Sequence, residues 1–356
     1  MTDLGWQQLL QSISNADNAA GLRRIRESVH DIMISRLPQQ QTEPFYGELN
    51  DVHDAMVRRC IWLAQKELAR LGKGNPPVPF AYLLFGSGGR MEQTLLSDQD
   101  SGMIYADPQN EADAVHCRDY FELLGKETVQ LLLMAGYPLC EGNVLSSNPD
   151  WCSSASVWKA RLGEWFREPA WEAVRYLLIV ADSRCVYGSA ELHADMMSHF
   201  YGDILSSPLI VRRMLDNTMK HKVLLNVFGQ LLKEQYGADA GSLDIKYGAY
   251  IPMVNAVRML AIEANLRETS TLGRIRLLEQ AGVVTAEDAR EWMQTFRLFM
   301  RLRMMTTEKL EGGQFSTNGK LSARKLSKEM AEELKSGLKL GKKLQRRVYR
   351  HTMGRL

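Results

Sequence analysis

The stretch AYLLFGSGGRMEQTLLSDQDSGMIYAD, residues 81–107, sets two apolar runs around a glycine cluster and two closely spaced aspartates. The runs "AYLLF" and "GMIYA" are short and flanked by turn residues, which predicts two β-strands. Between them, "GSGG" follows the first strand directly, and "SDQD" puts Asp98 and Asp100 at the entry to the second. A mixed α/β domain is therefore expected around this stretch.

The glycine cluster does not match two common phosphate-binding motifs. A P-loop requires Lys followed by Ser or Thr, which is missing here, and a dinucleotide fingerprint requires a third glycine where Met91 stands. The backbone N–H groups of a Gly-Ser pair can nevertheless approach a phosphate closely, and a helix opened by "GRMEQTLL" would add a favourable dipole. Gly86 and Ser87 are therefore predicted to bind a nucleoside triphosphate.

The two aspartates suggest a metal site. Residues two apart in a strand point to the same face, so Asp98 and Asp100 would present two carboxylates together. Hard divalent ions such as Mg²⁺ or Mn²⁺ take oxygen ligands and keep substrate phosphates in their shell. Arg90 could reach a phosphate, or pair with Glu92 or an aspartate and hold the loop. The alternative for the whole stretch is a glycine-rich turn with aspartates as turn formers.

The rest of the chain predicts an α+β protein in three parts. Apolar residues recur at helical spacing through an N-terminal helical region, residues 1–75. The α/β domain with a mixed sheet spans residues 76–192, and a helical bundle is expected over residues 193–356.

Composition indicates a globular protein with an expected cytoplasmic location. Of its 356 residues 45% are hydrophobic, no apolar run is long enough for a membrane span, and the N-terminus lacks a signal-peptide layout. The five cysteines form no C-x-x-C pair, so reduced thiols are expected. Residues 320–356 hold twelve Lys or Arg against three Glu, which indicates either a solvated helix face or a patch for acidic partners, nucleic acid included.

The stretch "GSGGRMEQTLLSDQDSGMIY" resembles the G-S-x-x-R-x-E-(x)-S-D-x-D signature of the DNA polymerase β-like nucleotidyltransferases. The resembling branch holds glutamine synthetase adenylyltransferase and the PII uridylyltransferase, and the chain is most similar to the nucleotidyltransferase family called DUF294. The similarity continues through four further stretches, "NDVHDAMVRRC", "CEGNVLSSNPDW", "ADSRCVYGSAEL" and "LDIKYGAYIPMVNAVRMLAIEANL", and covers residues 50–305.

This resemblance implies a nucleotidyltransferase domain followed by a helical domain that contributes to substrate binding. Mg²⁺ ions held by Asp98 and Asp100 would orient the nucleotide, an acceptor oxygen would attack the α-phosphorus, and pyrophosphate would leave. Gly86 and Ser87 would contact phosphate, and Lys246 is a possible substrate contact. The relatives favour a protein acceptor with a role in signal transduction, although small molecules and RNA are also modified in the superfamily.

The chain departs from the family pattern at two loop positions and at a third carboxylate. Gly88 stands where Glu is commoner, and Ser101 where Asn is commoner. The superfamily usually places a third carboxylate on a later strand, where it helps to activate the attacking hydroxyl. Glu141, next to Cys140, and Asp182 are the candidates. A rival interpretation follows, in which the protein is a nucleotide-sensing or partner-binding module that has lost turnover.

Overall fold

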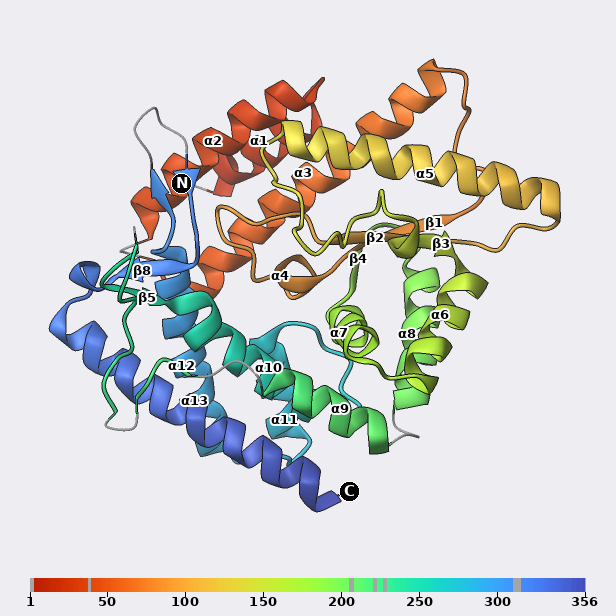
Figure 1. Ribbon diagram of the computed structural model, residues 1–356. Coiled ribbons are helices and arrows are strands. Elements are labelled where there is room, and N and C mark those ends of the chain that lie inside the picture. Colours follow the sequence, from red (N-terminus) through yellow and green to blue (C-terminus); the bar gives the residue numbers. More distant parts are fainter. Residues whose placement is uncertain are drawn as a thin grey trace. The chain divides into compact units, whose positions relative to one another are not determined.

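The computed structural model describes residues 3–37, 40–204, 208–219, 223–226, 229–237, 239–309 and 315–355. Figure 1 shows the helices and strands of these residues, and the chain divides into two compact units. Unit 1 consists of residues 1–164 and 182–200, and unit 2 consists of residues 165–181 and 201–356. The chain therefore leaves unit 1 after Glu164, contributes Trp165–Ala181 to unit 2, and returns to unit 1 for Asp182–Phe200. It then forms the rest of unit 2.

Unit 1 combines long helices with a small sheet. Its strands are β1 (Phe80–Leu84), β2 (Ser101–Tyr105), β3 (Cys152–Ser154) and β4 (Arg184–Gly188). Its helices are α1 (Asp3–Ser14), α2 (Ala19–Arg36), α3 (Thr42–Arg70), α4 (Gly86–Gly89), α5 (Glu111–Met134), most of α6 (Ala155–Arg167) and most of α8 (Ala190–Ile204). A 3₁₀ turn at Pro149–Trp151 leads into β3.

The four strands lie in the order β3-β2-β1-β4. β1 pairs antiparallel with β2 and β4, whereas β2 pairs parallel with β3, so the sheet is mixed. Every residue of β1 and β2 is buried, as expected for central strands that are covered on both faces. The two strands predicted from residues 81–107 are therefore confirmed, and they form the centre of the sheet.

Aromatic side chains pack α5 against the sheet. The ring of Phe121 stacks on Tyr105 of β2 at 4.4 Å between centroids and contacts Phe80 of β1 at 5.4 Å. Asn110 caps the first turn of α5 by accepting a hydrogen bond from the N–H of Asp113, which explains where this helix begins. Helix α5 therefore starts directly after its cap and lies against the two central strands.

Two local predictions were wrong. The residues "GRMEQTLL" do not open a helix, because α4 consists of the preceding segment "GSGG" and ends at Gly89. Met91 follows with φ 56°, a left-handed conformation that ends the helix, and the N–H of Glu92 turns back to the carbonyl of Ser87 at 2.8 Å. The third-carboxylate candidate Glu141 was expected on a later strand, but residues 137–144 form a turn and the next strand is β3.

Unit 2 is mainly helical. Its helices are α7 (Trp171–Val180), α9 (Pro208–Thr218), α10 (Ile251–Glu263), α11 (Thr271–Gln280), α12 (Ala286–Met304) and α13 (Lys328–Arg355). Two short antiparallel pairs accompany them, β5 (Ser242–Asp244) with β8 (Lys320–Ser322) and β6 (Glu308–Lys309) with β7 (Phe315–Ser316). A five-residue π-helical turn, Lys246–Tyr250, runs into α10, and a 3₁₀ turn, Ala323–Lys325, follows β8.

Helix α10 forms the centre of unit 2. Eleven of its thirteen residues, Pro252–Ile262, are buried, and a helix that is apolar on nearly all sides needs neighbours on all sides. Helices α9, α11 and α13 pack on it. The predicted α+β fold with a small mixed sheet and flanking helices is therefore confirmed. Among the described helices, none has the length and apolarity required to cross a membrane.

Candidate nucleotide and metal site

The glycine turn α4 directly follows β1 and holds a conformation that only glycine adopts readily. Gly86 has φ 52°, and a Cβ added there would lie 2.4 Å from Oδ2 of Asp100. In the described part of the chain, the N–H groups of Gly86, Ser87 and Gly88 donate to no other group. Three consecutive N–H groups in such a turn can form an anion-binding concavity.

The two aspartates lie in the segment just before β2, not within it. The backbone carbonyl of Asp100 accepts from the N–H of Phe85 at 2.9 Å, so the acidic segment runs directly beside the glycine turn. Both side chains are partly exposed and border a void of about 20 Å³ that is also lined by Gly88 and Gln93. A void of this size holds about one particle the size of water. The carboxylates therefore stand next to the glycine turn, at the edge of a small void that core side chains such as Val57 and Leu132 also line.

The third group near the pair is a thiol. Ligand atoms of Asp98, Asp100 and Cys140 all lie within 4.8 Å of one another. The pKa of Cys140 is raised to about 12, chiefly by burial and also by the charge of Asp100 and a hydrogen bond with its carboxylate. Glu141 is exposed and does not belong to this group. The turn therefore places Cys140, and not its neighbour Glu141, beside the two aspartates.

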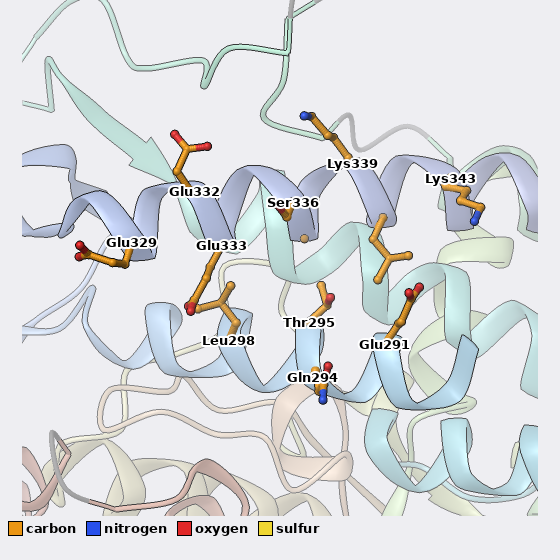
Figure 2. Close-up of a pocket in the computed structure, with 12 residues that line it drawn as sticks. Glu291, Gln294, Thr295, Leu298, Glu329, Glu332, Glu333, Ser336, Lys339 and Lys343 are labelled. Atoms are coloured by element: carbon orange, nitrogen blue, oxygen red, sulfur yellow. The ribbon is translucent and has the colours of Figure 1, made fainter. Parts of the chain in front are cut away.

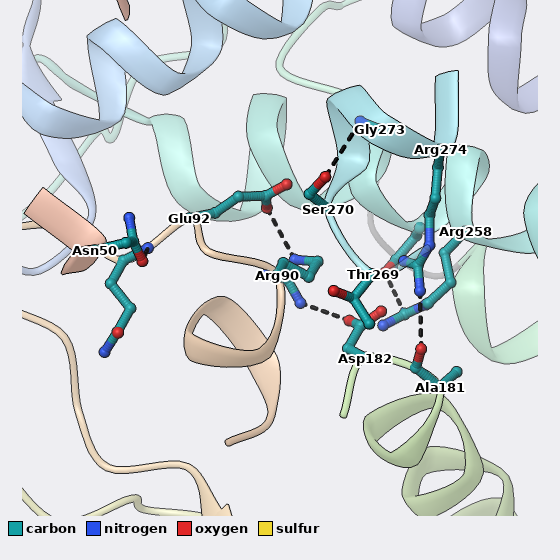
Figure 3. A network of polar contacts seen from close by, with 12 residues as sticks. Asn50, Arg90, Glu92, Ala181, Asp182, Arg258, Thr269, Ser270, Gly273 and Arg274 are labelled. Atoms are coloured by element: carbon teal, nitrogen blue, oxygen red, sulfur yellow. Dashed lines mark hydrogen bonds and ion pairs between the residues drawn. The ribbon is translucent and has the colours of Figure 1, made fainter. Parts of the chain in front are cut away.

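Asp182 and Arg90 are found together in a buried ion-pair cluster. Arg90 donates to Glu92 through Nε at 2.9 Å and to Asp182 through Nη1 at 2.6 Å (Figure 3). The three side chains are 6%, 3% and 1% exposed, respectively. We call this set the Arg90 cluster. Among the roles that the sequence left open, these contacts correspond to a residue that holds the loop, because the guanidinium is engaged by two carboxylates.

A second ion pair fixes the carbonyl side of the glycine turn. Arg184 of β4 contacts both carboxylate oxygens of Asp54 at 2.7 and 2.8 Å, and its Nη2 also donates to the carbonyl of Gly88 at 3.0 Å. Gly89 lies against the backbone of Asp182, because a Cβ added to it would come 1.7 Å from that carbonyl oxygen. The turn is therefore clamped from β4 and from the segment after α7, with no space for side chains at Gly89.

Helix α3 braces the segment between the turn and the aspartates. Asn50 accepts from the N–H of Gln93 at 3.2 Å, and His53 bonds the carbonyl of Thr94 through Nε2 at 3.0 Å. Because a carbonyl can only accept, Nε2 carries the proton and Nδ1 accepts from the Tyr137 hydroxyl at 2.8 Å. Burial, with the charge of Arg26, lowers the pKa of His53 to about 3, so it is neutral in the fold.

These bracing residues were not identified by reasoning from motifs. Asn50, His53 and Asp54 lie in "NDVHD", and Arg184 lies in "ADSR". Both stretches carried the family resemblance, which was the available signal, but their partners are 41 to 130 residues away. Their function in holding the loop became visible only from the contacts.

Unit 2 contains the remaining sequence-predicted residue and a separate groove. Lys246 lies in the π-helical turn, with its ammonium group 5.1 Å from the ring centroid of Tyr247. A groove of about 860 Å³ lies between α12 and α13, and the side chains of both helices line it (Figure 2). Its charged lining residues are Glu291, Glu329, Glu332, Glu333, Lys339 and Lys343. None of the site residues predicted from the sequence borders this groove.

Buried arginines also fasten the end of α7 within unit 2. Arg258 donates to the carbonyl of Leu178 at 3.2 Å, and Arg274 donates to that of Ala181 at 2.8 Å (Figure 3). The last carbonyls of a helix have no partner within the helix and carry partial negative charge, so guanidinium donors suit them.

The mixed sheet, its flanking helices and the Asp-x-Asp segment beside a glycine turn are those of a nucleotidyltransferase-like fold. Comparison with family models agrees with this assignment. Residues 23–172 match the model described as "Putative nucleotidyltransferase DUF294", and residues 208–352 match the "Putative nucleotidyltransferase substrate binding domain". The chain belongs to the DUF294 family, as the sequence resemblance predicted. No curated protein matches it significantly.

Proposed function

We propose that the protein is a nucleotidyltransferase that uses a divalent cation, Mg²⁺ or Mn²⁺, to transfer a nucleoside monophosphate from a triphosphate to an acceptor. The observation that carries this proposal is the glycine turn with three available N–H groups, placed directly against the Asp98 and Asp100 carboxylates. Phosphate oxygens would accept from the N–H groups, and the carboxylates would hold the cation.

Electrostatics explains why the two halves of such a site belong together. Two carboxylates beside a triphosphate repel it unless a cation lies between them, and a bound cation supplies the charge neutralisation. In the proposed reaction an acceptor oxygen forms a bond to the α-phosphorus, the bond to pyrophosphate breaks, and the acceptor proton passes to solvent or to a base. The chain's own contribution would be to hold the triphosphate in a fixed position, because the turn that contacts it is clamped by Asp54, Arg184 and the Arg90 cluster.

The test uses α-labelled and γ-labelled nucleoside triphosphates with Mg²⁺ and a cell extract. Label at the α position should move to an acceptor, whereas label at the γ position should leave with pyrophosphate. Asp98→Asn and Asp100→Asn should each reduce transfer by orders of magnitude, because each removes a charged metal ligand with little change in volume. Asp119→Asn, at an exposed position on α5, is the matched control and should transfer normally. Full transfer by both site variants would refute the proposal.

A second candidate function is a nucleotide-sensing or partner-binding module with little or no turnover. One observation favours it: the position beside the aspartate pair holds the Cys140 thiol, while Glu141 is exposed and Asp182 is paired with Arg90. A carboxylate that helps to deprotonate the acceptor is thus not part of the described cluster. Cation-dependent nucleotide binding without transfer of α-label to any acceptor would support this alternative over the enzyme.

We further propose that unit 2 binds the acceptor, with Lys246 as a candidate contact, and that a protein acceptor in the cytoplasm is favoured over nucleic acid. The match of residues 208–352 to a substrate-binding model supports this assignment. Helix α13 offers exposed positive charge at Lys343 and Arg346, whereas Arg347 already pairs with Asp288. Lys343→Glu with Arg346→Glu should weaken binding of an acidic acceptor and its salt dependence, while nucleotide binding stays unchanged.

A further inference from the structure

The position of Cys140 beside the aspartates is determined by backbone pairing. The N–H of Gln99 donates to the carbonyl of Pro138 at 2.9 Å, and the N–H of Ser101 donates to that of Val144 at 3.0 Å. The Gln99 side chain adds a bond to the carbonyl of Tyr137 at 2.9 Å. Hydrogen bonds on both sides of Asp100 therefore join the segment that holds the two aspartates to the 137–144 turn. This pairing places the Cys140 thiol close to the two carboxylates.

The resulting ligand set differs chemically from one made for Mg²⁺ alone. Mg²⁺ prefers oxygen ligands and dehydrates reluctantly, whereas a thiolate selects softer cations such as Zn²⁺, Cd²⁺ and Co²⁺. Ligands about 2.0–2.3 Å from one zinc ion lie roughly 3.5 Å apart in a tetrahedron, so ligand atoms within 4.8 Å need only small side-chain rotations to close around it.

We propose that Asp98, Asp100 and Cys140 form a three-ligand site for a thiophilic divalent cation, with Zn²⁺ as the representative. On binding, a bond forms between the cation and Sγ of Cys140, and the thiol proton passes to solvent. This inference rests on the proposed function in one respect: the same two carboxylates would serve Mg²⁺ during nucleotidyl transfer. A thiophilic cation therefore competes with Mg²⁺ and inhibits transfer, which makes the site sensitive to zinc.

The direct test is titration of the full-length protein with Co²⁺, monitored by the near-ultraviolet charge-transfer absorption that a cobalt–thiolate bond produces. The wild-type protein should develop this band at one equivalent of Co²⁺. Cys140→Ser should lack it and should bind Zn²⁺ at least about tenfold more weakly, since even loss of an outer partner of a metal ligand has effects of this size. Cys185→Ser is the matched control, because Cys185 is also partly exposed in unit 1, and it should keep the band.

The outcomes separate this inference from the proposed function. Mg²⁺-dependent nucleotide binding is measured in parallel for wild type and Cys140→Ser, which also verifies that the variant folds. If nucleotide binding is normal but no cobalt–thiolate band appears, or if the band persists in Cys140→Ser, the three-ligand site is refuted and the proposed function stands. If the Cys140-dependent band appears while no nucleotide binds, the metal site stands and the proposed function fails.

Discussion

Two ion-pair clusters, one in each unit, each join one basic residue to one Glu and one Asp, but they differ in their exposure to water. The Arg90 cluster in unit 1 joins one cation to two carboxylates, and its side chains are at most 6% exposed. In unit 2, Lys320 joins Glu234 at 3.3 Å and Asp239 at 3.1 Å, but these side chains are 25–38% exposed. We call the second set the Lys320 cluster. Water screens it, so the same charges contribute little to stability there.

This comparison shows that burial makes an ion pair hold its residues in one fixed geometry. In a low-dielectric interior an ion pair costs much to form and much to break, so it defines one geometry. The Arg90 cluster joins the residues after the glycine turn to Asp182, and a rigid turn is what binding of a phosphate requires. The Lys320 cluster joins two surface segments of unit 2 and leaves their charges accessible to partners. Four predictions test this comparison, from the largest expected effect to the smallest.

The largest effect is expected when one carboxylate of each cluster is neutralised. Asp182→Asn leaves the buried Arg90 with less compensating charge and should lower the free energy of unfolding by about 3–5 kcal/mol. Asp239→Asn in the exposed cluster should leave the urea midpoint unchanged within error. Urea denaturation followed by tryptophan fluorescence measures both. Equal shifts for the two variants would show that burial does not distinguish the clusters.

Acid should destabilise unit 1 through its buried neutral histidines. Burial, with the charge of Arg26, lowers the pKa of His30 to about 2 and of His53 to about 3, from 6.5. Below pH 6.5 the unfolded chain binds protons that the folded chain does not, so stability falls as pH drops toward the folded values. At pH 5 each histidine should cost about 2 kcal/mol relative to pH 7.

Hydrogen exchange measured peptide by peptide at pH 7 and pH 5 can localise this loss. Protection should fall first in α2 and α3, whereas unit 2, whose described histidine His351 is partly exposed, should change less. His53→Gln keeps a donor for the carbonyl of Thr94 but removes one titrating group. The loss of stability between pH 7 and pH 5 should therefore be smaller by about the 2 kcal/mol expected for one histidine. An unchanged slope would contradict the assignment of His53 as neutral in the fold.

Gly86→Ala should have an intermediate effect on stability and a specific effect on the site. The left-handed φ and the contact with Asp100 should together cost roughly 1–3 kcal/mol and displace the carboxylate, so cation binding should weaken. Gly47→Ala is the matched control in α3, where an added Cβ meets no atom within 4 Å. It should stabilise the protein by about 0.5–1 kcal/mol. Calorimetry with Mn²⁺ separates the two variants, and normal Mn²⁺ binding by Gly86→Ala would contradict the close packing.

The smallest effect is expected at Met91, just after the glycine turn. Its φ of 56° is strained for a residue with a Cβ, and its side chain is 37% exposed. Met91→Gly should therefore stabilise the protein by up to about 1 kcal/mol. Asn143, with φ 53°, is the control, because Asn tolerates this conformation and Asn143→Gly should change less. Thermal unfolding measures both, and destabilisation by Met91→Gly would show that the side chain contributes more than its backbone strain costs.

Short-range sequence patterns were sufficient to predict the two central strands and the acidic segment that form the candidate site. Short apolar runs flanked by turn residues located β1 and β2, and the spacing of Asp98 and Asp100 predicted paired carboxylates beside a glycine turn. The helix predicted to begin at "GRMEQTLL", residues 89–96, was wrong, because α4 ends at Gly89 and Met91 has a left-handed conformation. Local helix propensity does not predict the turn after Gly89, because that turn is stabilised by residues distant in the sequence, such as Asn50, which accepts a hydrogen bond from the N–H of Gln93.

The amino-acid sequence by itself indicated the family, through the resemblance of several stretches along the chain. It also indicated the fold class and the pair of aspartates, which depend on residue types at short spacing. Only the tertiary structure decided that Cys140 and not Glu141 lies beside the pair, and that Asp182 pairs with Arg90. Asp54 and Arg184, which clamp the glycine turn, are 130 positions apart. The physical reason is that hydrogen bonds and ion pairs depend on distances in space. For residues far apart in the sequence, these distances are set only by the folded structure.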